Sequence, residues 1–261
     1  MNEKRVKLSK QSGFTLVEMA IVLVIIGLIL GAVSIGRDLQ RDAEYAKVKQ
    51  KFVDQWASAY NAYYQRAGVV LGDDETRPQI MVNGFDFIAG SAVASGGNMA
   101  GLQGSVNAIC QGQQAPSMLR AANTNLHTYF DDLGIRMPPG RAEGSEDRYV
   151  YLDSNGNPQE VQVCFQWNNP EEPAGSGNMM VIAGLTPDLA RALDQMIDGK
   201  PDAQEGMFRR EGVDNGTAGG PGVPWAETNQ DRFGDGAGGG TGRNLDEDQI
   251  ITVVANYKMN Q

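Results

Sequence analysis

Apolar and polar positions divide the first quarter of the chain into two helical patterns. The first is the run 14–36, in which only Thr15, Glu18 and Ser34 are clearly polar, and Arg37 is the first basic residue after it. A helix of this length would be about 35 Å long at ~1.5 Å per residue, which is enough to cross a hydrocarbon layer of about 30 Å. The pattern therefore predicts a membrane-spanning helix over residues 14–36.

The second pattern continues the helix over residues 37–67 without a glycine or a proline, and Gly68 is expected to end it. Apolar residues recur at spacings of three, four and seven, and further apolar residues widen the same stripe. The main stripe comprises Leu39, Ala43, Ala46, Val53, Trp56, Tyr60 and Tyr63, and the widening residues are Tyr45, Val48, Phe52 and Ala59. We expect one helix of about 54 residues, apolar all round in its first half and amphipathic in its second.

Residues 68–261 alternate between apolar segments and turn signals, which predicts a globular head of the α+β class. A long connection rich in Gly, Ser, Asn and Pro covers 72–116, and a helix is expected from Pro116 to Gly134. Strands are expected at 148–152, 160–167, 179–183 and 250–257, with a hairpin loop at 153–157 and a short helix capped by Thr186. Apolar residues alternate along 160–167, so one face of an antiparallel sheet should pack on the long helix. These residues are Val161, Val163, Phe165 and Trp167.

Charge is distributed unevenly along the chain. The formal net charge is −10, yet the segment before Phe14 carries four basic residues against one acidic residue. Positive charge before an apolar span keeps that end in the cytoplasm, so we expect the N-terminus inside and the head outside. The remainder of the chain is acidic and repels phosphates, so we expect no binding of nucleic acid.

Two features of the head predict further sites. Cys110 and Cys164 are the only cysteines, and an even pair in an exported head predicts one disulfide. Residues 212–242 are rich in glycine, and acidic residues that could supply oxygen ligands to Ca²⁺ lie in and after this stretch. A calcium site and a solvated loop both remain open here. The candidate ligands are Asp231, Asp235, Asp246, Glu247 and Asp248.

Catalytic chemistry has little support in the sequence. His127 is the only histidine, and no nucleophile or orienting acid stands at motif spacing from it. Asp153, Asn155 and Asn157 imitate the start of a calcium-binding EF-hand loop, but Pro158 stands where glycine is required. We expect a structural histidine, a turn at 153–157 and no enzymatic activity.

Glu18 is the unusual residue of the membrane span, because a carboxylate in hydrocarbon is costly without a partner. A cleaved secretory signal would have a shorter apolar region that ends in a small-residue cleavage site. A simple membrane anchor has the right length but offers Glu18 no partner. The short basic leader followed by Gly13-Phe14-Thr15-Leu16-Val17-Glu18 resembles the N-terminal segment of type IV prepilins and of type II secretion pseudopilins.

The resemblance implies a function for this segment. A prepilin peptidase would remove the leader 1–13 by cutting after Gly13, and Phe14 would become an N-methylated terminus. An inner-membrane assembly platform and its ATPase would then extract the subunit into a helical homopolymer outside the cytoplasm. Glu18 of one subunit would meet the cationic Phe14 terminus of its neighbour and so set the register of the filament.

Weaker similarities leave the kind of filament open. Residues 66–74 and 185–209 are similar to blocks of one branch of pilin-like proteins, and major secretion pseudopilins bind calcium near their C-terminus. The head 68–261 is large for a major pseudopilin, which favours a pilus subunit. A secretion pseudopilin and an uncleaved, membrane-anchored binding module remain as alternatives. Gly27 and Gly31 form a GxxxG pattern, and with Gly36 they would permit close helix packing or local unwinding.

Overall fold

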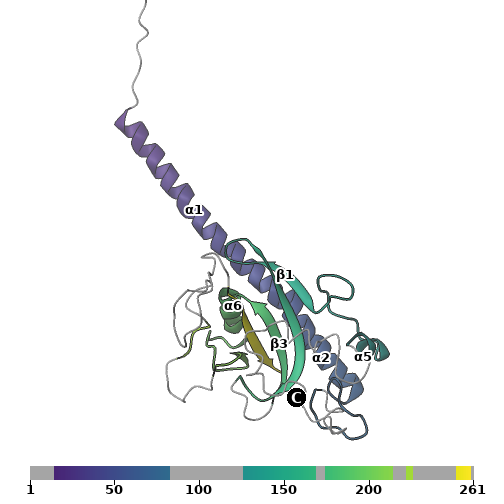
Figure 1. Cartoon of the computed structure of the whole chain (residues 1–261). Coiled ribbons are helices and arrows are strands. Elements are labelled where there is room, and N and C mark those ends of the chain that lie inside the picture. The colour runs from purple at the N-terminus through teal and green to yellow at the C-terminus, as the bar shows by residue number, and fades with distance from the viewer. Residues whose placement is uncertain (1–14, 83–125, 169–173, 214–221, 226–250, 260–261) are drawn as a thin grey trace, which may run out of the picture. The chain divides into compact units, whose positions relative to one another are not determined.

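A computed structural model describes residues 15–82, 126–168, 174–213, 222–225 and 251–259 (Figure 1). The chain divides into two compact units, Met1–Asp42 and Ala43–Gln261. The long helix begins in the first unit as α1, Leu16–Val48, and continues as a π-helical turn η1, Lys49–Val53, and as α2, Asp54–Ala67. The predicted helix is confirmed over residues 16–67 apart from the π turn, and Phe14, where it was expected to begin, lies outside the described residues.

The π turn changes which residues of the helix face the core. Phe52 and Val53 are adjacent in sequence and both fully buried, because the wider turn shifts the phase of the helix between them. Tyr45 and Val48 are buried before the turn, as are Trp56, Tyr60 and Tyr63 after it. The prediction that Leu39 and Ala43 belong to the buried stripe is wrong, since both are exposed.

Gly68 ends the helix as predicted. Its φ of 74° lies in the left-handed region, and its N–H donates a hydrogen bond to the carbonyl oxygen of Tyr64 at 2.9 Å. A residue with a Cβ is strained in this conformation, so glycine is the favoured residue at this position.

The described part of the head contains one antiparallel sheet of five strands, in the order β1-β2-β3-β5-β4. The predicted hairpin joins the first two strands, and the last strand begins three residues later than predicted. The start of the predicted helix from Pro116 lies outside the described residues, and its described part is α5, Leu126–Asp132. The strands are β1 Arg148–Leu152, β2 Pro158–Asn168, β3 Gly177–Leu185, β4 Phe208–Arg210 and β5 Val253–Lys258.

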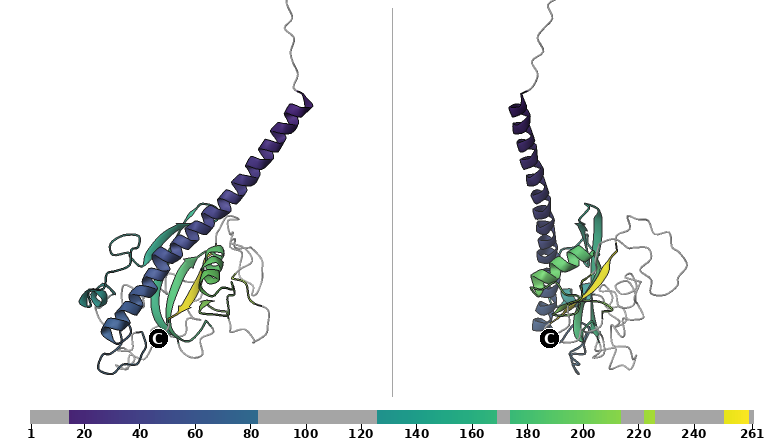
Figure 2. Two further views of the ribbon diagram at one scale, coloured as in Figure 1. Left: turned by 180° about the vertical axis from the view of Figure 1, so that it is seen from behind. Right: turned by 90° about the vertical axis from the view of Figure 1, so that its left-hand side faces the viewer.

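The main core lies between α2 and one face of the sheet (Figure 2). The ring of Phe165 in β2 stacks on Tyr60 at a centroid distance of 5.2 Å and tilts against Trp56 at 6.0 Å. Cys164 points to the opposite face, where it packs with Met179, Val181 and Ala183. The predicted alternation along this strand is therefore confirmed.

Two short helices complete the described part of the head. In α6, Pro187–Ile197, the Thr186 hydroxyl accepts the N–H of Leu189 at 3.4 Å, as predicted for its N-cap. In α5, the Nε2 atom of His127 lies 3.0 Å from a carboxylate oxygen of Glu146. The backbone carbonyl of Glu146 accepts the indole N–H of Trp56 at 3.3 Å. This chain of contacts ties the sole histidine to the loop before β1, which fits a structural role.

Candidate functional site

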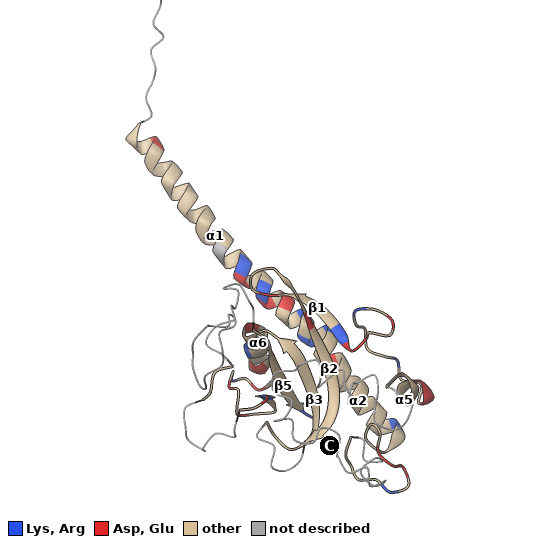
Figure 3. Ribbon diagram, viewed as in Figure 1, with Lys and Arg blue, Asp and Glu red and all other residues tan. Residues whose placement is uncertain are grey.

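The first unit contributes an uncovered apolar helix surface. Every residue from Leu16 to Val33 is exposed, and the large apolar side chains among them expose between 42% (Met19) and 90% (Leu16) of their surface. Figure 3 shows this part of α1 almost free of charged residues, which begin again at Arg37. Among the described residues, the helix 16–67 is the one long and apolar enough to cross a membrane.

Such a surface is unfavourable in water. Fully burying one Leu, Ile, Val or Met side chain is worth about 1.5–3 kcal/mol, and this segment exposes more than a dozen of them. An apolar patch of that size on a soluble monomer is unusual and marks a surface that lipid or other protein covers. The segment therefore requires lipid or another protein surface to cover its apolar side chains.

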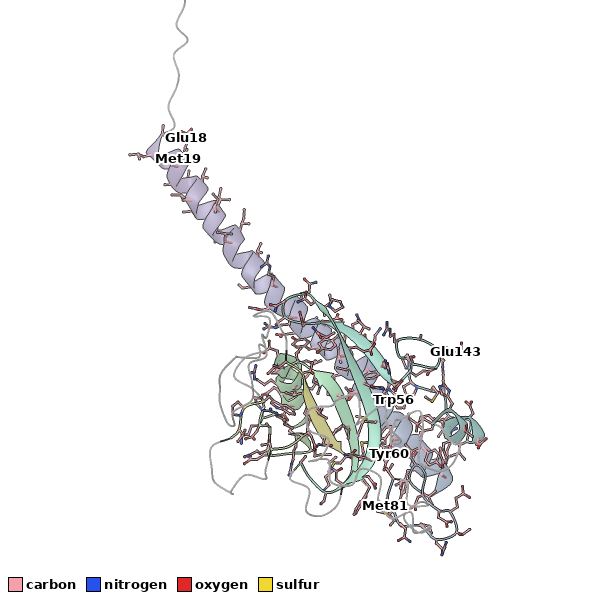
Figure 4. All side chains as sticks on the ribbon, in the orientation of Figure 1. Glu18, Met19, Trp56, Tyr60, Met81 and Glu143 are labelled. Carbon is pink, nitrogen blue, oxygen red and sulfur yellow. The ribbon has the colours of Figure 1, made fainter. Side chains whose placement is uncertain are left out.

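Glu18 lies at the start of this helix (Figure 4). One of its carboxylate oxygens, Oε2, accepts the backbone N–H of Thr15 at 2.8 Å and the Thr15 hydroxyl at 2.9 Å. The N–H of Glu18 donates in return to the Thr15 hydroxyl at 3.3 Å. Thr15 is the N-cap residue and Glu18 is at position N3, so the two form a capping box. In this arrangement the side chain of each residue accepts a hydrogen bond from the backbone N–H of the other.

The capping box gives Glu18 a partner within its own helix. The Thr-x-x-Glu spacing at the start of an apolar run is a known sign of this arrangement, and the prediction for Glu18 did not include it. The hydrogen bonds occupy Oε2, so the other oxygen of the carboxylate can bind an additional donor. A negative charge in the first turn also interacts favourably with the positive end of the helix dipole.

The predicted cleavage residues lie at the edge of the described chain. Gly13 and Phe14 are outside the described residues, so the cleavage site and the methylated terminus remain predictions. Thr15 follows Phe14 directly in the sequence. The Glu18 carboxylate is therefore hydrogen-bonded to Thr15, the residue that directly follows the expected terminus.

The glycines of the span leave the helix intact. Gly27, Gly31 and Gly36 all lie within α1, so the described helix is not unwound at these positions. A Cβ atom added at any of them would meet no atom within 4 Å. These positions leave space for close approach of another helix, as a GxxxG pattern permits in membranes.

The other predicted sites lie wholly or partly beyond the described residues. Cys164 is buried in β2 with 1% of its surface exposed, but Cys110 is outside the described ranges, so the disulfide remains a prediction. All five candidate calcium ligands, Asp231, Asp235, Asp246, Glu247 and Asp248, are also outside them. Within the described residues, no group of three or more His, Cys, Asp or Glu side chains could hold a metal ion.

The EF-hand-like segment is a turn, as expected. A carboxylate oxygen of Asp153 accepts the backbone N–H groups of Asn155 and Asn157, each at 2.8 Å. The same side chain also accepts the amide of Gln159 at 3.1 Å. The carboxylate therefore stabilises the β1–β2 hairpin loop.

Comparison with known proteins concerns the same N-terminal segment. Residues 8–34 match the family described as the prokaryotic N-terminal methylation motif. Neither the comparison with curated proteins nor the comparison with solved structures gave a match. The matched range includes Gly13, Phe14 and the Thr15–Glu18 capping box. The chain therefore carries, at residues 8–34, the prepilin-type cleavage and methylation segment of type IV pilins and pseudopilins.

Proposed function

We propose that this protein is the structural subunit of a type IV pilus-like filament. In this proposal, a prepilin peptidase cuts after Gly13, Phe14 is N-methylated, and the subunit polymerises through α1. The observation that carries the proposal is the methylation motif at 8–34 on a helix whose apolar residues are exposed all round. The role is structural rather than catalytic.

Before assembly, the subunit resides in the inner membrane. The apolar part of α1 spans the lipid, the basic leader stays in the cytoplasm and the head lies outside. The capping box supports this state, because the Glu18 carboxylate accepts two hydrogen bonds from Thr15 instead of entering lipid unpartnered.

During assembly, the apolar surface of α1 moves from lipid to the corresponding helices of other subunits. Van der Waals packing drives helix association where lipid tails are as apolar as the side chains, and the open glycine positions allow close contact. The Glu18 carboxylate meets the Phe14 amine of a neighbouring subunit. A single polar pair in an apolar interface fixes the register, as a lone polar residue does in a coiled coil.

The head supports a role as the outer part of the subunit. Its described core is complete without residues 16–42, since the buried residues of the long helix begin at Tyr45. An assembly platform and its ATPase would act on α1 and leave the head folded. We further propose that Cys110 and Cys164 form a disulfide outside the cytoplasm.

The experiment is intact-mass measurement of the protein from envelope fractions, combined with electron microscopy of cells that lack it. We expect a mature chain that begins at methylated Phe14, and loss of surface fibres in the deletion strain with secretion unchanged. A Gly13→Leu variant provides the control, because a bulky residue at the cut site should leave the leader attached. An intact leader on the wild-type protein would contradict the proposal. Normal fibres with lost secretion would assign the chain to a secretion pseudopilus instead.

A further inference from the structure

Three aspartates gather at the C-terminal end of α6, on the side of the head that holds Trp225. Asp194 is fully buried, Asp198 caps the end of the helix one turn later, and Asp202 is buried in the loop 199–207. The Oδ2 atom of Asp194 accepts the N–H of Asp202 at 2.7 Å and the indole N–H of Trp225 at 2.8 Å. This one oxygen thus joins α6 to two separate segments of the head.

The Asp198 carboxylate joins α6 to the sheet in the same way. Its Oδ2 atom accepts the backbone N–H groups of Met207 and Phe208, each at 2.9 Å. Phe208 is the first residue of β4, so this carboxylate fixes the entry of the chain into the edge strand.

The remaining oxygen of Asp194 has no hydrogen-bond donor within the described part of the chain. Asp194 Oδ1 is buried and accepts no hydrogen bond from any residue that the structure describes. The carboxyl group of Asp198, four residues on along the same helix, interacts with that of Asp194 as a neighbouring acid. Two ionised carboxylates in contact at a buried site repel each other, and an unpaired buried charge is costly.

The nearby basic groups do not neutralise this pair. The Lys200 ammonium lies 3.0 Å from Asp202 and 2.7 Å from Glu205, both in its own loop. The Arg210 guanidinium of β4 donates to the backbone carbonyl of Trp225 at 2.7 Å. On β5, burial raises the pKa of the Tyr257 hydroxyl, and the charges of Asp54 and Asp198 raise it as well. In the described surroundings, these groups are engaged elsewhere or carry no positive charge.

We propose that Asp194 and Asp198 share one proton, and that this proton keeps the Asp198 carboxyl group against α6 and so holds the start of β4 at Met207 and Phe208. The shared proton gives Asp194 Oδ1 the hydrogen-bond partner that the described residues do not supply. One proton on a pair of contacting carboxyl groups is the ordinary outcome when both cannot ionise together.

The electrostatic surroundings agree with this geometry. The pKa of Asp194 is raised from an ordinary value of 3.8 to about 7, chiefly by burial and also by Asp198, against the lowering effect of the Trp225 and Asp202 hydrogen bonds. The folded protein therefore keeps a proton that the unfolded chain releases near pH 4. Stability must then fall as the pH rises from about 4 to about 7, and level off above that.

Asp198 is the group that can move when the proton is lost. Asp198 is half-buried, whereas Asp194 is fully buried, so the Asp198 carboxylate can move out into solvent. Its departure would free the N–H groups of Met207 and Phe208. The first strand residues of β4 should therefore open before the rest of the sheet.

The test is thermal unfolding of the full-length chain in detergent between pH 5 and pH 8, with amide hydrogen exchange at Met207 and Phe208. We expect the wild-type Tm to fall with rising pH, and exchange at both amides, corrected for intrinsic rates, to increase at least about tenfold, since one pKa unit corresponds to a factor of ten. Asp194→Asn supplies an N–H donor in place of the proton. It should flatten both dependences and have a higher Tm than wild type at pH 8.

Control variants show whether the shared proton causes the pH dependence. Asp131→Asn removes an exposed carboxylate from α5 and should leave the pH dependence unchanged. Asp198→Asn should flatten it as well, and serves if Asp194→Asn does not fold. Equal pH dependence in wild type and in either Asn variant would overturn the proposal. So would a rise in wild-type Tm with calcium at pH 8 that Asp194→Asn abolishes, because the pair would then hold a metal ion.

Discussion

Gly184, at the end of β3, is a single residue that decides how three strands fit together. Its φ of 81° lies in the left-handed region, and a Cβ atom there would collide with the backbone carbonyl oxygen of Glu160 in β2. The pairing of β3 with β5 shifts register between Ile182 and Leu185, so Gly184 lies in a bulge. Its own carbonyl accepts the hydroxyl of Tyr151 in β1 at 3.2 Å. Glycine is therefore required for both backbone conformation and space.

We predict that Gly184→Ala lowers the free energy of unfolding by about 2–4 kcal/mol, because strain and a backbone collision add. Gly156→Ala is the matched control. Gly156 also has a positive φ, of 84°, but a Cβ there would meet no atom within 4 Å, so about 1 kcal/mol is expected. Denaturant unfolding of both variants measures the difference. Equal losses would show that the contact with Glu160 is unimportant.

The site residues could be predicted from the sequence only where they form a local sequence motif. The order of Gly13, Phe14 and Glu18 in an apolar context is such a pattern, and the family match at 8–34 agrees with it. The Thr-x-x-Glu spacing also indicates that Thr15 caps the helix, but the sequence prediction did not include this role. The bond between Asp194 and Trp225 spans 31 positions. No periodicity in the sequence links two residues across a loop of that length.

At the scale of elements, short-range chemistry predicted ends and turns correctly. Gly68 ends the long helix, Thr186 caps α6, and Asn155-Gly156 lies in the hairpin loop, because each depends on neighbours within a few residues. The π turn at 49–53 was not predicted. It arises from packing, which requires both Phe52 and Val53 in the core. The position of β5 between β3 and β4 likewise depends on long-range contacts.

Trp56 connects the helix to several other elements of the head. Its ring packs on Phe130 of α5 at 6.3 Å and on Phe165 of β2 at 6.0 Å, and its N–H binds the backbone of Glu146. We predict that Trp56→Ala costs about 3–5 kcal/mol of stability. Trp56→Phe keeps most of the ring packing and should cost clearly less.

The same measurement supplies a control for position along the helix. Tyr64→Ala removes a half-buried aromatic ring from α2, outside the main contact with β2, and should cost less than Trp56→Ala. Chemical denaturation of the three variants gives the order. If Trp56→Ala were no worse than Tyr64→Ala, the contacts of Trp56 with α5 and β2 would not be important for stability.

For the molecule as a whole, the two units differ in whether their apolar side chains are covered. The described core belongs to the unit Ala43–Gln261, where aromatic rings from helix and sheet are buried together. The helix in Met1–Asp42 leaves its apolar residues uncovered from Leu16 to Val33. One unit thus folds by covering its own apolar side chains, and the other needs lipid or further subunits. This division fits the proposed role as a subunit that is stored in the membrane and then polymerises.

Fibre yield from cells that express Glu18→Gln tests the proposal that the negative charge of Glu18 directs polymerisation. Glutamine can still accept the Thr15 hydrogen bonds of the capping box, so the helix start is kept and only the negative charge is removed. Glu44→Gln, on the same helix, is the control. We predict at least about a tenfold loss of fibres for Glu18→Gln, with normal cleavage after Gly13, and wild-type yield for Glu44→Gln. Wild-type fibre yield from Glu18→Gln would contradict the claim.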